Sequence, residues 1–205
     1  MESARVAVSI TFGATPDTFF AGAEPLDMNV RPVPSLGHTH IAASPPPRRI
    51  TDAEGRLIDL RRYGDGPVDS ERERLVEMYL DFDPSQRSLG LPPIRERRIR
   101  EWLDVLLDGD NVLAWDRDKV IGQAVLVDSG EQECELAIFL HQDYHGAGIG
   151  TQLTETLLSY GKTRGIRRVW LVVERSNSPA VALYHDVGFT LARSLGHDVE
   201  MEIFL

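Results

Sequence analysis

The 205-residue chain has one cysteine, Cys134, and only two lysines, Lys119 and Lys162. A single thiol cannot form an internal disulfide, and Cys134 lies in an apolar stretch typical of a buried free thiol. No apolar run reaches the roughly 18 residues that a membrane-spanning helix needs. The N-terminus has no basic start followed by an apolar stretch. We therefore expect a cytoplasmic protein with no membrane partner.

The chain also lacks excess positive charge, since its formal net charge is −10. Nucleic-acid-binding proteins need a cationic surface to displace counterions from phosphates, so we expect no nucleic-acid partner. An acidic surface attracts cationic or amine-bearing molecules instead. The length suits a single hydrophobic core, which favours one domain.

The first 50 residues differ from the rest of the chain in composition. They contain much of the proline, including the run at 45–47, and show little periodicity, so residues 1–50 are interpreted as a flexible tail. Residues 5–12, RVAVSITF, alternate in polarity and are an alternative candidate for an edge strand. Residues 51–205 are expected to form the folded domain.

From residue 56 onward, the hydrophobic pattern predicts an α/β fold on a mixed, mostly antiparallel sheet. Asp69 or Ser70 is a plausible N-cap for the first helix. The stretch 134–174 predicts a strand, loop, helix and strand joined as a parallel right-handed crossover. Expected strands are 56–63, 111–118, 119–130, 134–141, 167–175, 190–196 and 197–205; expected helices are 68–82, 92–110, a helix beginning near 150, and 178–188.

The stretch HGAGIG, residues 145–150, leads directly into a predicted helix. Glycine allows positive φ and close approach of a ligand, and a helix N-terminus offers unpaired N–H groups to a phosphate or pyrophosphate. The spacing excludes a Walker loop, which needs a Gly-Lys-Ser/Thr ending. It also excludes the dinucleotide pattern G-x-G-x-x-G, because Thr151 stands where its third glycine belongs.

This loop resembles the acyl-CoA loop Q/R-x-x-G-x-G/A of the GNAT acetyltransferase superfamily, with His145 at the usual Gln or Arg and Ala147 where many members have a cation. NSPAVALYHDVGF, residues 177–189, is similar to a second family signature, N-x-x-A-x-x-L-Y-x-x-x-G-F. The resemblance covers about residues 56–205. It implies a GNAT-like fold with a central crossover that binds acetyl-CoA. It also implies these cofactor-binding residues: Phe139, Leu140, His141, His145, Gly146, Ala147, Gly148, Ile149, Gly150, Thr151, Asn177 and Tyr184.

Acetyl transfer to an amine requires the amine to be neutral, and an alkylamine of pKa near 10.4 is neutral in only about one molecule in 2,500 at pH 7. The resemblance implies that Glu135 is the base, with Glu133 as an alternative on the same face of the strand. It implies that Tyr184 protonates the departing sulfur, although a tyrosine on the apolar stripe of a helix is also a common core residue. Asn177 resembles the ligand of the pantetheine arm, and a helix-capping asparagine would look the same.

The leading hypothesis is an enzyme that transfers an acetyl group from acetyl-CoA directly to a primary amine on a small molecule or peptide. His141 and His145 lie on a strand end and a loop without a supporting cluster, so no metal is expected. Cys134 has no paired base, which favours direct transfer over an acyl-enzyme. The alternative is a catalytically silent module that senses acyl-CoA or acts as a scaffold. Homodimers are common in the family, so a homodimer is possible.

Overall fold

The computed structural model describes residues 43–86 and 92–205, and these form a sheet of eight strands with helices on both faces. The strands are β1 (Arg48–Thr51), β2 (Leu57–Arg62), β3 (Asp110–Asp116), β4 (Lys119–Gly130), β5 (Glu133–Leu140), β6 (Arg168–Glu174), β7 (Thr190–Leu195) and β8 (Asp198–Phe204). The α-helices are α1 (Val68–Leu80), α2 (Glu96–Leu106), α3 (Ile149–Thr163) and α4 (Ser178–Val187); short 3-10 turns are η1 (Pro84–Gln86) and η2 (Gln142–Tyr144).

The strand order is β1-β2-β3-β4-β5-β6-β8-β7, and every neighbouring pair is antiparallel except β5 and β6. Helix α3 connects these two strands, as the predicted crossover requires. The mixed, mostly antiparallel α/β fold predicted from the sequence is therefore confirmed. The parallel pairing is short, because it runs only from Glu133↔Arg168 to Glu135↔Trp170. Beyond Glu135 the two strands separate.

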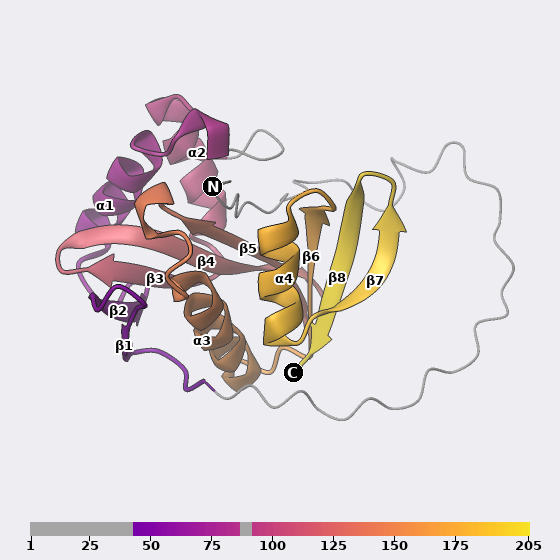
Figure 1. Ribbon diagram of the computed structural model, residues 1–205. Coiled ribbons are helices and arrows are strands. Elements are labelled where there is room, and N and C mark those ends of the chain that lie inside the picture. Colours follow the sequence, from indigo (N-terminus) through magenta and orange to yellow (C-terminus); the bar gives the residue numbers. More distant parts are fainter. Residues whose placement is uncertain (1–42, 87–91) are drawn as a thin grey trace, which may run out of the picture.

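Helices α1 and α2 cover one face of the sheet, and α3 and α4 lie on the other (Figure 1). Successive residues of β4 show why both faces must be covered. Gln123 accepts a hydrogen bond from the Tyr79 hydroxyl of α1 at 2.5 Å, whereas a Cβ on Gly122 would lie 3.3 Å from Leu153 of α3. Side chains alternate across a strand, so a central strand between two helical layers is apolar on both sides.

Helix α2 buries one apolar stripe, made of Ile99, Trp102, Leu103 and Leu106. Trp102 packs edge-to-face on Tyr79 and on Phe139 of β5, with ring centroids 5.0 and 5.1 Å apart. The predicted N-cap of α1 is wrong. The helix begins at Val68 after Pro67, and no side chain caps it from that position. The buried Glu71 carboxylate instead reaches back and accepts hydrogen bonds from the N–H groups of Gly64 and Gly66.

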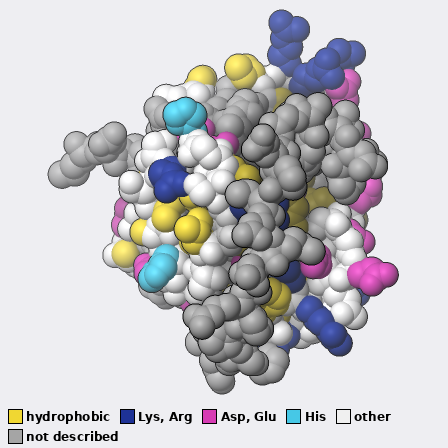
Figure 2. Space-filling model, turned by 90° about the vertical axis from the view of Figure 1, so that its right-hand side faces the viewer, with side chains coloured by type: hydrophobic (Ala, Val, Ile, Leu, Met, Phe, Trp, Pro, Cys, Tyr) yellow, Lys and Arg dark blue, Asp and Glu magenta, His cyan; other side chains and the backbone are white. Residues whose placement is uncertain are grey.

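The end of the sheet formed by β8 and β7 is more exposed than the central strands. Every residue of the edge strand β7 is exposed, including Leu191, and Phe204 at the end of β8 is also exposed. Figure 2 views the molecule from this side and shows hydrophobic side chains on the surface. The candidate strand at residues 5–12, and most of the predicted tail, lie outside the described residues. The boundary at residue 51 stays a prediction, and β1 spans it.

Candidate acyl-CoA site

The glycine loop lies between the end of β5 and the start of α3. Gly146 and Gly148 have φ values of +75° and +80°, and a Cβ at either position would meet no atom within 4 Å. Their backbone is therefore shaped for glycine and open on one side. Gly150 differs from the expectation for this loop. It lies inside α3, where a Cβ would lie 2.9 Å from Leu183, so it allows α4 to pack closely.

The N-terminus of α3 is a ready anion site. Gly148 is its N-cap, and the first hydrogen bond of the helix runs from Gln152 N–H to the Gly148 carbonyl. The N–H groups of Ile149, Gly150 and Thr151 therefore have no acceptor within the helix. The first turn contains no acidic residue. These donors, with the positive end of the helix dipole, fit a pyrophosphate.

The separation of β5 from β6 gives the site its second component. His141 N–H donates to Ile121 of β4 at 2.8 Å, and Phe139 is paired with Gln123 of the same strand. Because alternate residues of a strand direct their backbone groups to opposite sides, Leu140 and not Phe139 or His141 faces the gap left by β6. Of the three residues expected to pair with the pantetheine arm, only Leu140 directs its backbone groups toward this gap.

Glu135 lies at the point where the strands separate. It is the last residue of β5 paired with β6, and it is only 5% exposed. The alternative base, Glu133, forms an ion pair with Arg168 at 2.8 Å. Glu135 is buried beside the gap between the strands, whereas Glu133 is partly exposed, so Glu135 stays the first candidate for the base.

Tyr184 lies on α4 with no exposed surface, and its ring packs on Phe189 at a centroid distance of 5.7 Å. Its hydroxyl has no hydrogen-bond partner within residues 43–86 and 92–205. Burial raises the pKa of Tyr184 well above its ordinary value. The phenol therefore keeps its proton at neutral pH, as a proton donor must, and a buried unpaired hydroxyl fits a site completed by a bound molecule.

The geometry of Asn177 is compatible with both roles that the sequence left open. Its side-chain oxygen caps α4 by accepting from Ala180 N–H at 3.4 Å. Its buried Nδ2 has no partner in the described part of the chain and so remains a donor for a ligand. One amide can thus serve as both cap and ligand contact.

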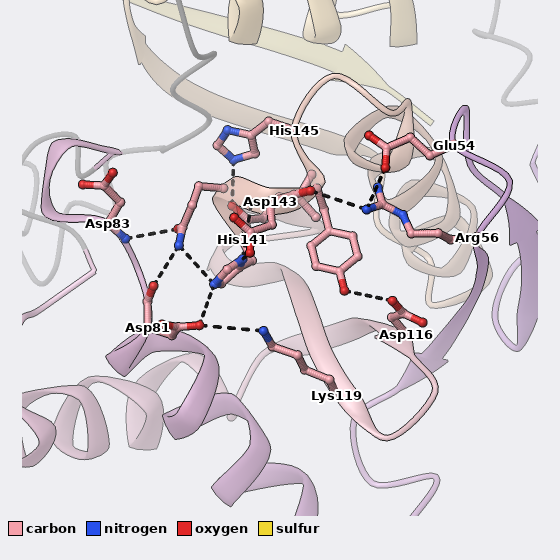
Figure 3. Close-up of polar contacts among 12 residues, drawn as sticks. Glu54, Arg56, Asp81, Asp83, Asp116, Lys119, His141, Asp143 and His145 are labelled. Atoms are coloured by element: carbon pink, nitrogen blue, oxygen red, sulfur yellow. Dashed lines mark hydrogen bonds and ion pairs between the residues drawn. The ribbon is translucent and has the colours of Figure 1, made fainter.

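The two loop histidines have separate structural partners. His141 is buried, with Nε2 3.1 Å from Asp81 at the end of α1. His145 donates from Nε2 to the Leu140 carbonyl at 2.8 Å (Figure 3). Burial lowers the pKa of His145, so near pH 7 it supplies no permanent cation like the arginine it replaces. Within the described residues, no three His, Cys, Asp or Glu side chains are grouped to hold a metal ion.

Cys134 is buried on β5, as predicted. Burial, followed by the nearby carboxylates of Asp128 and Asp110, raises the pKa of its thiol to about 11. Little thiolate is present at neutral pH, so Cys134 is poorly suited to act as a nucleophile.

Sequence reasoning missed one group near the loop. Asp52, Arg56 and Tyr144 join the turn before β2 to the segment that precedes Gly146. No periodic or motif signal indicates such a contact, because the turn and the loop lie about 90 residues apart along the chain.

The fold and loop define the class first: an α/β domain built around a glycine loop at a helix N-terminus. A sequence model of the Acetyltransferase (GNAT) family matches residues 72–189, and the chain belongs to this family. The predicted family is therefore confirmed, and with it acetyl-CoA as the acyl donor that this family uses.

Curated relatives include mycothiol acetyltransferases. That of Corynebacterium glutamicum (strain R) is 31% identical over 115 residues, covering 56% of this chain and 38% of that protein. That of Thermobifida fusca (strain YX) is 27% identical over 161 residues, covering 75% of this chain and 50% of that protein. The chain thus spans half or less of the length of these two relatives.

Solved structures show the same fold. The GNAT domain of S. lividans PAT superimposes with a TM-score of 0.65 at 22% identity, covering 77% of this chain and 96% of that chain. The PaiA N-acetyltransferase of Thermoplasma acidophilum, solved in complex with coenzyme A, superimposes with a TM-score of 0.57 at 23% identity. The match covers 72% of this chain and 99% of that chain. Among the described helices, none has the length and apolar character to cross a membrane.

Proposed function

We propose that this chain is an N-acetyltransferase that moves the acetyl group of acetyl-CoA directly to a primary amine. The observation that carries this is the open glycine loop at the N-terminus of α3, which follows the strand that separates from β6 after Glu135. Helix α4, which bears the buried hydroxyl of Tyr184, packs on the start of this helix through Leu183 and Gly150. No described residue and none of the relatives above favours a silent acyl-CoA-binding module.

We assign the following binding and catalytic roles to the residues of the site. The N–H groups at the start of α3 hold the pyrophosphate, while Asn177 Nδ2 and the Leu140 backbone orient the pantetheine arm. Bound acetyl-CoA supplies an acetyl group activated as a thioester. Glu135 takes a proton from the acceptor ammonium, directly or through water, so that the amine can attack the carbonyl. Tyr184 gives its proton to the departing sulfur.

The face of the sheet that carries Glu135 favours an acceptor with positive charge. Trp170 pairs with Glu135 on one side and with Glu202 on the other, so all three side chains lie on this face. Alternation along β8 adds Asp198 and Glu200. Arg168 neutralises part of this charge, and the remainder attracts an ammonium group.

A calorimetric titration with acetyl-CoA tests the donor site. Gly148→Asp should weaken binding by about 100-fold or more, because it places a carboxylate beside the pyrophosphate. Gly165→Asp is the matched control, since Gly165 also has positive φ, at +83°, and open space around its Cβ, but lies beyond the other end of α3. Equal losses in both variants would indicate backbone strain instead of a phosphate site.

Turnover with a panel of primary amines tests the reaction. The panel includes the acceptors of mycothiol acetyltransferase and of spermidine N-acetyltransferase, which are enzymes among the similar proteins. We expect acetylation of at least one amine and release of free CoA. Tight acetyl-CoA binding without turnover of any amine would contradict the proposed enzymatic activity and favour the catalytically silent module. The possible homodimer and the cytoplasmic location stay predictions.

A further inference from the structure

The turn between β1 and β2, residues 52–56, packs against the acyl-CoA loop although it lies outside the part of the chain matched by the family model. Ala53 N–H donates to the Ala147 carbonyl at 3.1 Å. This carbonyl stands between Gly146 and Gly148, the two loop residues with positive φ. A turn that is distant in the sequence therefore binds the loop between its two flexible glycines.

That hydrogen bond fixes more than one atom. A trans peptide is planar, and its C=O and N–H point in opposite directions. When Ala53 holds the Ala147 oxygen, the N–H of Gly148 in the same peptide unit must point away from the turn. The contact therefore sets the direction of a loop N–H next to the donors at the start of α3.

The turn is itself held rigidly by Asp52, whose side chain is fully buried. One carboxylate oxygen accepts from the N–H groups of Glu54 and Arg56, and the other accepts from Arg56 Nε at 2.6 Å. Burial acts to raise the pKa of Asp52, but the hydrogen bonds from Arg56 and from the backbone outweigh it and lower the pKa. Asp52 is therefore ionised at neutral pH, where the turn is fully braced.

Arg56 adds contacts between the turn and the segment that precedes Gly146. Its guanidinium carbon lies 4.3 Å from the centre of the Tyr144 ring, and Nη1 reaches the Asp143 carbonyl at 3.5 Å (Figure 3). The Tyr144 hydroxyl donates to Asp116 at the end of β3 at 2.8 Å. The segment before the glycines is thus attached to the β1–β2 turn and to the end of β3.

We infer that the turn 52–56, braced by Asp52 and Arg56, is a positioning element that holds the acyl-CoA loop in its binding conformation. This rests on the proposed function. We assign Arg56 to the loop and not to the phosphates, because Asp52 and Glu54 neutralise its charge and its other contacts are with Tyr144 and the Asp143 carbonyl. A loop held in advance binds more tightly, because less ordering remains for the ligand to impose.

Arg56→Met tests the inference, since methionine keeps an apolar stem over Tyr144 and removes the ion pair with Asp52. Calorimetry with acetyl-CoA should give a dissociation constant about 10-fold higher, whereas kcat and the KM for the amine stay within about twofold. Arg56→Lys should recover part of the affinity, because an ammonium also pairs with a carboxylate and contacts an aromatic face.

Arg49→Met is the matched control. Arg49 forms an ion pair with Asp59 in the same hairpin, but it is exposed, and within residues 43–86 and 92–205 no hydrogen bond or ion pair joins it to the loop. This variant should bind acetyl-CoA like the wild type. Unchanged affinity in Arg56→Met would overturn the inference, as would parallel losses in kcat and amine KM, which would indicate general damage. Wild-type protein that fails to bind acetyl-CoA would overturn the proposed function as well.

Discussion

The two halves of the sheet are built differently. Strand β4 is buried from Val120 to Leu126 and β5 from Cys134 to Leu140, between α1 and α2 on one side and α3 on the other. Strands β6 and β8 alternate between buried and partly exposed residues, because α4 covers only one face. The halves are joined by just three register pairs, which end at Glu135.

This difference explains where the candidate site lies. A strand pair that continued would satisfy its own backbone groups, but the separation of β5 and β6 leaves backbone polar groups facing a gap. The two-sided half supplies a rigid support for the loop, and the one-sided half leaves an open acidic face next to Glu135. The donor is thus expected in the gap between the two halves, and the acceptor on the acidic face of the second half.

The largest effect on kcat is expected at Glu135, where β5 and β6 separate. Glu135→Gln should lower kcat at pH 7 by about 100-fold or more, because the acceptor then loses its base. The defect should shrink as pH rises toward the amine pKa of about 10, where the amine is already neutral. A pH profile of initial rates between 7 and 9 measures this. Glu133→Gln, which removes the carboxylate bound to Arg168, is the control; the reverse pattern would make Glu133 the base.

Tyr184→Phe should have the next largest effect. We expect kcat to fall by about 10- to 100-fold, since the departing sulfur loses its proton donor. The melting temperature should not fall, because the hydroxyl makes no hydrogen bond to another described residue. Rates measured alongside thermal unfolding separate the two roles. Full activity with unchanged stability would make Tyr184 a core residue only.

Arg168 tests how firmly the halves are joined. It forms ion pairs with Glu133 of β5 and with Glu200 and Glu202 of β8. Arg168→Met should lower the free energy of unfolding by about 1–3 kcal/mol, because it leaves three partly buried carboxylates together. Arg49→Met, which removes an exposed pair, should cost about 0.5 kcal/mol or less. Equal effects in a denaturant titration would mean that the halves do not depend on Arg168.

The smallest effect is expected at Cys134. Cys134→Ala should leave kcat within about twofold, because direct transfer needs no enzyme thiolate. A pKa of about 11 also leaves the thiol protonated at neutral pH. Steady-state rates and mass spectrometry of the protein mixed with acetyl-CoA provide the check. A stable acetyl adduct on wild-type protein, together with an inactive variant, would overturn direct transfer.

Three features could be predicted from the residues alone: the order of elements from residue 57 onward, the crossover and the family. These depend on local patterns, such as the apolar stripe of α2 and the glycine spacing before α3, which neighbouring residues impose on one another. The N-cap of α1 was predicted wrongly because the helix begins after Pro67 with no side-chain cap, while Glu71 of its first turns binds the preceding turn. The role of Gly150 depended on Leu183, a residue of another helix.

Contacts between distant segments could be read only from the three-dimensional fold. Strand separation after Glu135, the ion pair that occupies Glu133, the orientation of the Leu140 backbone, and the contact of Ala53 with Ala147 all depend on pairing between segments far apart in the chain. Sequence patterns report which face of an element is apolar, and they carry no signal for the partner that a polar group finds across the fold.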